Sequence, residues 1–434
     1  MSNSLPKGKP LGYWSVVSIG IGGMVGGGIF AVLGLAVQLS HGGTPVAFAV
    51  AGIVALVTSY SYSKLSVTYP SQGGTVEFLN QAFGIGLITG GLNILLLLSY
   101  IVMLSLYAFA FGSYGASFFP IAMQPFWKHV FITGIIILLT GLNILGAKIV
   151  GKSEELIVAL KITILFIFIG AGLWSVNPHR LEPSTWTNPL QLIAGGMIIF
   201  LAYEGFELIA NTAGDVKNPR KTLPRAYYST VGFVIALYVL VSLVTVGNLP
   251  IDQIVAARDY ALAASAKSFL GSSGFILIAI AALLSTSSAI NATLYGTSRV
   301  SYIVAKEGEL PKILGGKIWN RPIVGLLITS ILTLFIANLF NLSSISIMGS
   351  AGFLLVFAAV NTANLRLYKK TTSHRVISAL GIVLCLSALV ALILQVAATS
   401  PREILILVVM IGSAFTIEEI YRKYNGIEIR LHKN

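Results

Sequence analysis

Long apolar runs constrain this chain more than any other feature of its sequence. A helix needs roughly 20 mostly apolar residues to cross the hydrocarbon core of a bilayer, and twelve runs reach that length. They are too long for buried strands, and barrel strands would be short and alternate polar with apolar residues. We therefore predict an all-α polytopic membrane protein with transmembrane helices over residues 13–40, 45–68, 84–110, 127–146, 154–176, 189–211, 226–248, 272–300, 321–340, 344–366, 376–398 and 402–421.

The charged residues support this prediction by their number and their positions. Only 10% of the residues are charged, against about 25% in soluble domains, which excludes an ordinary soluble enzyme and a disordered chain. With the N terminus in the cytoplasm, 22 of the 28 Lys and Arg residues fall on the cytoplasmic side. This asymmetry follows the positive-inside rule and predicts a multi-pass protein of the cell membrane with both termini cytoplasmic. The basic residues are spread over successive loops, so the lipid bilayer is the expected partner rather than nucleic acid.

Cofactor and metal chemistry is not indicated by the sequence. The single cysteine, Cys385, lies in an apolar run, and the five histidines fall near loops, so neither a disulfide framework nor a metal site is predicted. No phosphate-binding P-loop motif and no catalytic triad are present, so we expect neither ATP-driven transport nor an enzyme. The first span is too long for the apolar core of a signal peptide.

The spans also suggest an internal repeat. The starts of the first five spans and the next five are offset by about 176 to 194 residues, and because five is odd, the second set enters the membrane from the opposite side. Inverted repeats of this kind define many transporter folds. The predicted organisation is an N-terminal segment (1–12), a first repeat (13–176), a second repeat (189–366), two further helices (376–421) and a tail (422–434).

Glycines interrupt the first span of each repeat, which is the best sequence indication of a central binding site in such transporters. Unwound backbone in hydrocarbon is tolerated only where protein or a polar ligand satisfies it. The N–H groups that begin one half-helix suit a carboxylate, and the carbonyls that end the other suit an ammonium group. The alternative is that the glycines only allow close helix packing. The glycines concerned are Gly20, Gly22, Gly23, Gly26, Gly27 and Gly28 in the first span, and Gly195, Gly196 and Gly205 in the sixth.

Several motifs, taken together, resemble the amino acid–polyamine–organocation superfamily. They are residues 22–30 (GGMVGGGIF), 69–74 (YPSQGG), 203–207 (YEGFE), 215–225 (DVKNPRKTLPR), 298–302 (SRVSY) and 306–311 (KEGELP). The chain is similar to the proton-coupled prokaryotic amino acid transporters of this superfamily. The resemblance implies a fold of five plus five helices with broken first and sixth helices and two extra helices. It also implies alternating access, with amino acids or related amines as substrates.

The resemblance further implies a substrate site. Family members hold the substrate carboxylate on backbone N–H groups at the first-helix break, and the amino group on carbonyls of the first and sixth helices. Tyr100, Tyr107 and Tyr203 are candidate aromatic gates, although tyrosines that pack or lie at the lipid interface are more common. The predicted substrate site consists of Gly23, Met24, Gly26, Gly27, Gly28, Ile29, Leu201, Tyr203, Glu204 and Gly205.

Lys161 is predicted to lie inside the fifth span. An ionisable group there is a candidate functional group, and because burial disfavours a charged ammonium, Lys161 could exchange protons. In the proton-coupled members that the sequence resembles, a fifth-helix lysine occupies the place where sodium-coupled members bind sodium. Its expected neighbours are carbonyls of the first break and the hydroxyl of Ser285, Ser287 or Ser288. The alternative is a structural ammonium that never titrates, and both interpretations predict sodium independence.

Two acids lie beside Gly205 in the sixth span. Glu207 matches a position where family members often carry an acid, and its candidate roles are proton coupling, gating or a structural hydrogen bond. Glu204 departs from the family pattern, which has a small or apolar residue there. It could favour a cationic substrate or carry the proton. The two acids would share a helical face unless the helix breaks at Gly205. Farther along, Asp215 is expected to pair with a nearby base at the inner gate.

These features predict a secondary active transporter of amino acids that works by alternating access, coupled to protons and independent of sodium. A second hypothesis is an exchanger of amino acids, amines or polyamines, which Glu204 would favour. A third, from a different class, is a nutrient sensor built on a transporter fold.

Overall fold

The structure, a computed structural model, describes residues 10–145, 150–306 and 323–424. Within these residues every regular element is a helix, and β-pairing is limited to two isolated bridges. The predicted all-α fold is confirmed. Most of the predicted N-terminal segment and tail, and all but the first residue of the 306–311 motif, lie outside the described residues.

The described helices follow the predicted spans in order. Nine are long and apolar enough to cross a membrane, and two bent helix pairs raise the number to eleven. The seventeen-residue apolar helix α12 (Ile323–Leu339) occupies the place of the remaining predicted span. The nine long helices are α3 (Thr44–Thr68), α5 (Leu87–Ala116), α6 (Gln124–Leu145), α7 (Val150–Leu173), α9 (Pro219–Asn248), α11 (Ala261–Lys306), α13 (Leu342–Arg366), α15 (Arg375–Thr399) and α16 (Pro401–Tyr424).

The two bent pairs are the spans that glycines were predicted to interrupt. α1 (Tyr13–Met24) and α2 (Gly28–Ser40) meet at an angle of 42°, and α8 (Pro189–Ile198) and the 3-10 helix η4 (Phe200–Asp215) meet at 41°. Each pair opens one of the two predicted repeats. The division of the chain into inverted repeats remains a prediction.

Short helices that the apolar runs did not predict connect the spans. Each is too short or too polar to cross a membrane, so a search for long apolar runs passes over it. They are α4 (Thr75–Phe83), η1 (Ile121–Met123), η2 (Pro178–Leu181), η3 (Pro183–Thr185), α10 (Ile251–Ala256), η5 (Arg258–Tyr260) and α14 (Tyr368–Thr371).

Local signals set several helix starts. α3, α8 and α9 each carry a proline in their first turn, where the missing N–H costs no intrahelical hydrogen bond. The side chains of Asn188 and Asn341 accept hydrogen bonds from the backbone N–H groups of Gln191 and Ser344, each at 2.9 Å, and so cap α8 and α13. These caps satisfy N–H groups that the helices themselves leave free.

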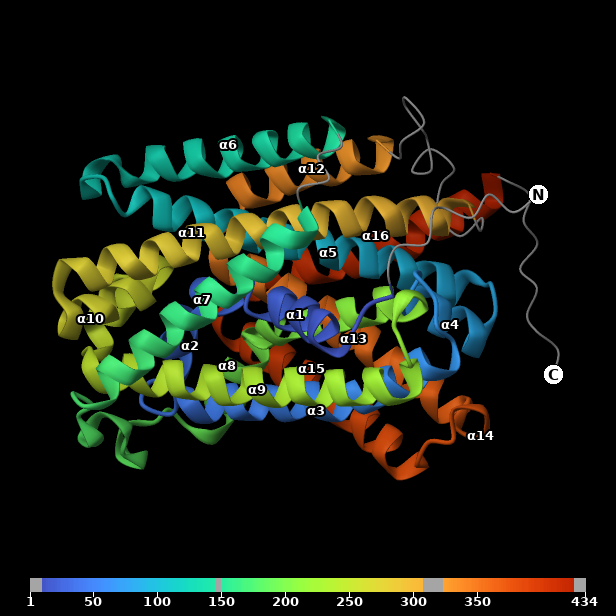
Figure 1. Cartoon of the computed structure of the whole chain (residues 1–434), viewed down its shortest axis with the longest axis horizontal. Coiled ribbons are helices and arrows are strands. Elements are labelled where there is room, and N and C mark those ends of the chain that lie inside the picture. Colours follow the sequence, from blue (N-terminus) through green and yellow to red (C-terminus); the bar gives the residue numbers. More distant parts are fainter. Residues whose placement is uncertain (1–9, 146–149, 307–322, 425–434) are drawn as a thin grey trace.

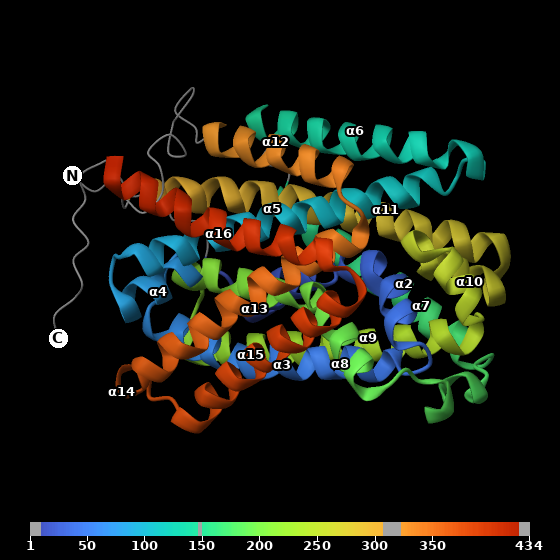
Figure 2. The ribbon, with the colours of Figure 1, turned by 180° about the vertical axis from the view of Figure 1, so that it is seen from behind.

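The spans pack as two groups. One consists of α1, α3, η4 and α9, and the other of α5, α6, α11 and α12. Figures 1 and 2 both show α3, α8 and α9 on one side of the molecule and α6, α11 and α12 on the other. α7 contacts α9 and α1 of the first group and α11 of the second. α1 therefore lies at the boundary between the groups, near the middle of the view in Figure 1.

Two spans form the centre of the protein. The most apolar windows of α5 and α13 are 83% buried inside the protein, against 28% for α6 and α16. Because α5 contacts α6, α11, α13 and α16, it presents side chains to the interior along its whole length. The functional side chains described below project from α5, α7, α9, α11 and α13 toward the two bent pairs.

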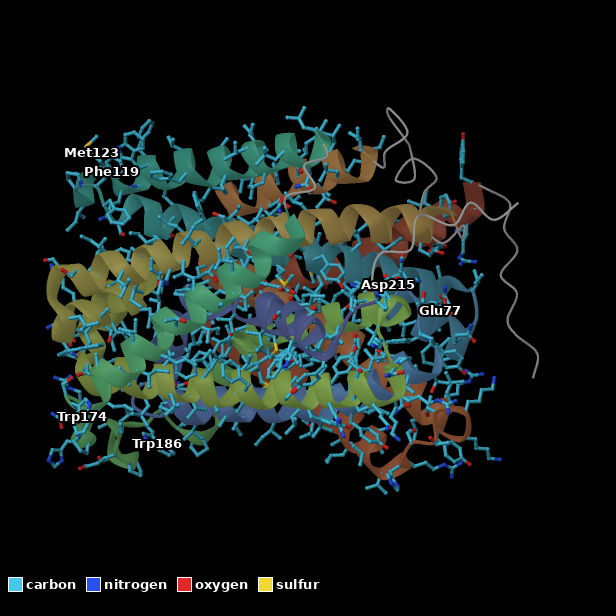
Figure 3. All side chains as sticks on the ribbon, viewed as in Figure 1. Glu77, Phe119, Met123, Trp174, Trp186 and Asp215 are labelled. Atoms are coloured by element: carbon cyan, nitrogen blue, oxygen red, sulfur yellow. The ribbon has the colours of Figure 1, made fainter. Side chains whose placement is uncertain are left out.

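The bundle has two distinct ends. α14 lies at one end and α10 at the other (Figure 1). Figure 3 places Glu77 and Asp215 toward the α14 end, and Trp174 and Trp186 at the α10 end. We refer to these as the α14 end and the α10 end.

At the α14 end, the residues before α1 are tied to the end of η4. Leu11 N donates to Asp215 O, and Lys217 N donates to Leu11 O, each at 2.8 Å, which pairs Leu11 with Val216 as a parallel bridge. The carboxylate of Asp215 accepts from Gln72 Nε2 at 3.2 Å. The described residues give this carboxylate an amide partner and no ion pair with a base, so the expected pairing is not found there.

Candidate functional site

The first break is the non-helical segment of residues 25–27 between α1 and α2. It matches the predicted position, because Gly26 and Gly27 lie inside it and Gly28 begins α2. A Cβ on Gly28 would lie 2.7 Å from the Cα of Ala202 in η4, so a side chain there would require η4 to move. The glycine at this position lets the two bent pairs cross with their backbones in contact.

Four consecutive carbonyls that lead into the first break each accept a side-chain hydrogen bond. Lys161 Nζ on α7 donates to Gly22 O at 3.1 Å, and Tyr107 Oη on α5 donates to Gly23 O at 3.2 Å. Tyr238 Oη on α9 donates to Met24 O at 2.6 Å, and Ser285 Oγ on α11 donates to Val25 O at 2.7 Å. The donors come from four different helices. The end of α1 is therefore held by both helix groups and by α7.

The start of α2 presents backbone donors instead. Its N-cap, Gly27, has no side chain to accept from the first N–H groups of the helix, and the first intrahelical bond runs from Ala31 N to Gly27 O at 2.9 Å. The N–H groups of Gly28, Ile29 and Phe30 precede that bond and have no intrahelical acceptor. A helix start of this kind favours an anion. The geometry suits the predicted carboxylate site.

The second break lies at Ile199, between α8 and η4. The sequence pointed to Gly195, Gly196 and Gly205, but the first two lie within α8 and the third within η4, so the break is not at a glycine. Ser350 Oγ on α13 donates to Ile198 O at 2.8 Å and accepts from Leu201 N at 3.0 Å. This hydroxyl bridges the freed backbone groups, which explains why no local glycine is needed there.

Gly205 allows η4 to cross α1. A Cβ on Gly205 would overlap backbone atoms of Gly23 and Met24, and a Cβ on Gly23 would lie 2.9 Å from Gly205 O. These neighbours are backbone atoms, which cannot rotate away. The predicted substrate residues Gly23, Met24 and Gly205 are thus brought together, although Gly205 acts as a crossing point rather than a break.

Lys161 is 1% exposed, and its ammonium reaches the first break through Gly22 O. Of the three serines expected nearby, Ser285 bonds to the first break. Ser287 instead donates to Leu283 O of its own helix at 2.6 Å, and Ser288 is half-buried one residue further on. The structure thus brings Lys161 and Ser285 to carbonyls three residues apart, Gly22 O near the end of α1 and Val25 O in the break.

Glu207 is fully buried and already hydrogen-bonded. One carboxylate oxygen accepts from Tyr100 Oη on α5 at 2.7 Å and from Thr75 Oγ1 on α4 at 2.8 Å. Thr75 Oγ1 is in turn 2.9 Å from Tyr62 Oη on α3. Glu207 therefore joins η4 to three other helices on the α14 side of the break.

Glu204 is also fully buried, but neither of its carboxylate oxygens has a hydrogen-bond partner among the described residues. A 3-10 helix has three residues per turn, so side chains at i and i+3 align. The structure thus places Glu204 and Glu207 on one face of η4, together with Leu201 and Ala210. All four are buried.

The structure gives partners to three tyrosine hydroxyls near the bent pairs, of which Tyr107 and Tyr203 were predicted candidates and Tyr238 was not. The Tyr203 hydroxyl donates to Phe48 O on α3 at 3.0 Å, so it joins two helices of the first group. Tyr107 and Tyr238 instead reach the first break. The aromatic ring of Tyr107 lies against Gly27 as well. Spacing in the sequence gives no signal for Tyr238 or Ser350, because the break residues that they contact, Met24 and Leu201, are more than 140 residues away from them.

No metal site is found in the part of the chain that the structure describes, since no group of three or more His, Cys, Asp or Glu side chains gathers there. The site instead combines backbone donors at the start of α2, an ammonium on α7 and two acids on η4. This combination can bind a small polar ligand that carries both charges.

The chain matches the model of the amino acid permease family over residues 11–415. It is 37% identical to the inner membrane transport protein YbaT of Escherichia coli over 83% of this chain and 84% of the relative. It is 26% identical to a methylthioribose transporter of Bacillus subtilis, over 85% and 83% of the two chains. It is 25% identical to the branched-chain amino acid permease BcaP of the same organism, over 83% and 81%.

Proposed function

We propose that this chain, which belongs to the amino acid permease family, is a proton-coupled, sodium-independent transporter of amino acids that works by alternating access. The family and the named relatives are permeases and transporters rather than enzymes, and the apolar helices make it a multi-pass membrane protein. Proton coupling, the transport cycle and the orientation in the membrane belong to the proposal. We propose the orientation in which both termini lie in the cytoplasm, so that the α14 end faces the cytoplasm.

The observation that carries the proposal is the hydrogen bond from Lys161 Nζ to Gly22 O. It places a buried amine on the half-helix that ends at the first break. A cation at this position repels a sodium ion from the same carbonyls. A proton gained or lost by the amine would change the charge beside the substrate site, which gives proton binding a direct route to substrate binding.

Alternating access is supported by the arrangement of the helices. α1 and η4 pack in the first helix group, α1 lies at its boundary with the second group, and the crossing of the two bent pairs is held by backbone contacts between Gly23, Gly28 and η4. Movement of one group against the other would open the bent pairs first to one end of the bundle and then to the other.

The test is uptake of radiolabelled amino acids into proteoliposomes with an imposed pH gradient, with and without sodium. We expect accumulation when the outside is acidic, because protons then move inward with the substrate, and no response to sodium. In Lys161→Met we expect the response to the pH gradient to fall at least tenfold, while counterflow without a gradient is retained.

Lys128→Met is the matched control. Lys128 lies at the α10 end, with Nζ 3.6 Å from Asp259 Oδ2, away from the first break. Uptake driven only by sodium would contradict the proposed coupling. Full pH-gradient response in Lys161→Met would leave that lysine with a structural role. Obligatory exchange in wild type, without net uptake, would favour the exchanger hypothesis.

A further inference from the structure

We propose that the carboxylate of Glu204 is the counter-ion for the α-ammonium group of the substrate. This inference rests on the proposed transport function and names the chemical group that the site selects. It adds a charged side chain of η4 to the backbone carbonyls that the family resemblance implies for the amino group.

The first argument is the absence of a protein partner. Glu204 is 0% exposed, and neither carboxylate oxygen finds a donor among the described residues. A buried polar group without a partner is costly, and a buried charge much more so. Glu207, three residues on and equally buried, accepts two hydrogen bonds on one oxygen, while its other oxygen has no partner among the described residues. The protein therefore supplies donors to one acid of this helix face and none to the other, which leaves both oxygens of Glu204 available to a ligand.

The second argument is position. Glu204 lies between Ala202, which contacts Gly28 at the start of α2, and Gly205, which contacts Gly23 and Met24 at the end of α1. Both neighbours touch the first break, so the Glu204 backbone lies beside it. A ligand carboxylate on the N–H groups of α2 would place its α-amino group only two bonds from its carboxyl carbon, within this small region.

The third argument is that the backbone carbonyls leading into the first break already accept hydrogen bonds from protein donors. Gly23 O accepts from Tyr107, and Met24 O accepts from Tyr238, whose hydroxyl also lies 3.3 Å from Ala202 O. Gly22 O and Val25 O accept from Lys161 and Ser285. A substrate ammonium that relied on these carbonyls would share each of them with an existing donor. Glu204 offers two oxygens and a full negative charge without that competition.

The substrate class follows from this chemistry. The site should select compounds that carry an ammonium group next to a carboxylate and discriminate against analogues in which a hydroxyl replaces the amine. A hydroxyl is neutral and cannot form the ion pair, so its hydrogen bond does not compensate for the cost of desolvating the Glu204 carboxylate.

The experiment compares purified wild type with Glu204→Gln in detergent. Thermal stabilisation is titrated with each of the twenty amino acids, and the pairs L-leucine with L-2-hydroxyisocaproate and L-alanine with L-lactate report on the amine. We expect wild type to prefer the amine of each pair. In Glu204→Gln the affinity for every amino acid that binds wild type should fall by about 30-fold, the scale of a lost charged hydrogen bond, while the hydroxy acids change by less than about threefold.

Two further variants separate binding from folding. Glu204→Asp keeps the charge and should recover part of the amine preference. Glu403→Gln is the matched acid-to-amide control, because Glu403 is half-buried on α16 and bonds to Ser344 Oγ at 3.0 Å. It should bind as wild type does. If Glu204→Gln is unstable without ligand, Glu204→Asp carries the comparison.

Each other outcome overturns the assignment. An unchanged amine preference in Glu204→Gln with loss of pH-driven uptake would make Glu204 a proton carrier. Loss confined to lysine and arginine would place the substrate side chain, not the α-amino group, at Glu204. If none of the twenty amino acids stabilises wild type, the proposed function fails. Titration with methylamine and isobutylamine then tests separately whether Glu204 binds an ammonium group. Binding of these amines that does not depend on Glu204, or no binding at all, would overturn the inference.

Discussion

The two breaks differ in how their freed backbone groups are satisfied. At the first, four carbonyls each receive a donor from a different helix, α5, α7, α9 and α11. At the second, one hydroxyl, that of Ser350 on α13, serves both sides of the break. The first break is thus fixed by many long-range contacts and the second by a single one.

This difference indicates which groups at each break can bind a charged group of a ligand. The carbonyls that lead into the first break already accept hydrogen bonds, and the N–H groups that begin α2 have no intrahelical acceptor and no side-chain cap. The second break has its backbone satisfied and is followed by the unpartnered acid Glu204. On the proposed assignment, the first break binds the anionic group of the substrate and the segment after the second break binds its cationic group. Three substitutions probe this contrast.

The largest effect is expected where the two bent pairs touch. In Gly205→Val, the added side chain would overlap the backbone of Gly23 and Met24, and overpacking of this kind costs about 3 kcal/mol or more. We expect counterflow in proteoliposomes to fall by at least about 100-fold. Gly170→Val on α7, where a Cβ would meet nothing within 4 Å, is the control. Normal counterflow in Gly205→Val would mean that η4 and α1 are not held in contact at this point.

A smaller effect is expected at the second break. Ser350→Ala leaves Ile198 O and Leu201 N without their shared partner, and each buried unpaired group costs about 1–3 kcal/mol. We expect substrate affinity to fall by roughly tenfold, measured by thermal stabilisation. Ser346→Ala, one turn earlier on the same helix, removes a buried hydroxyl that has no partner among the described residues. Equal effects of the two variants would show that Ser350 does not set the geometry of the break.

The smallest effect is expected at the first break, where the donors are several. Tyr107→Phe removes the bond to Gly23 O and keeps the ring against Gly27, and one neutral hydrogen bond contributes about 1 kcal/mol net. Substrate affinity should fall by about fivefold. Tyr114→Phe removes a bond of the same length, 3.2 Å, to Phe30 O beyond the break, and should leave affinity unchanged. A loss as large as that of Ser350→Ala would contradict the view that the first break has redundant support.

The fold was largely predictable because the thickness of a bilayer sets the length of the apolar run that each spanning helix needs. The runs of apolar residues therefore located the spans, and the run of Gly26, Gly27 and Gly28 located the first break. The second break was placed wrongly, at glycines, because the residue that supports it, Ser350, lies on α13 and is about 150 residues away in sequence. No local pattern contains that information.

In the candidate site, too, features of the local sequence were predictable and contacts between distant helices were not. Lys161 was recognisable because a lysine in an apolar span is rare, and its contact with the first break follows from the family resemblance. The partners of Glu207 and the lack of partners for Glu204 could not be predicted, because both depend on how α4 and α5 pack against η4. The gate role of Tyr203 stays a prediction, and the contact of its hydroxyl with Phe48 O on α3 could not be read from the sequence.

The bridge between Leu11 and Val216 has a kinetic consequence. Two backbone hydrogen bonds join Leu11, two residues before α1, to Asp215 at the end of η4 and to Lys217 beyond it, and they do not depend on which side chains are present. The ends of the two bent pairs at the α14 end are therefore coupled while the bridge holds. In the proposed transport cycle, opening at this end would be a single cooperative event with one rate constant, instead of two gates that open in succession.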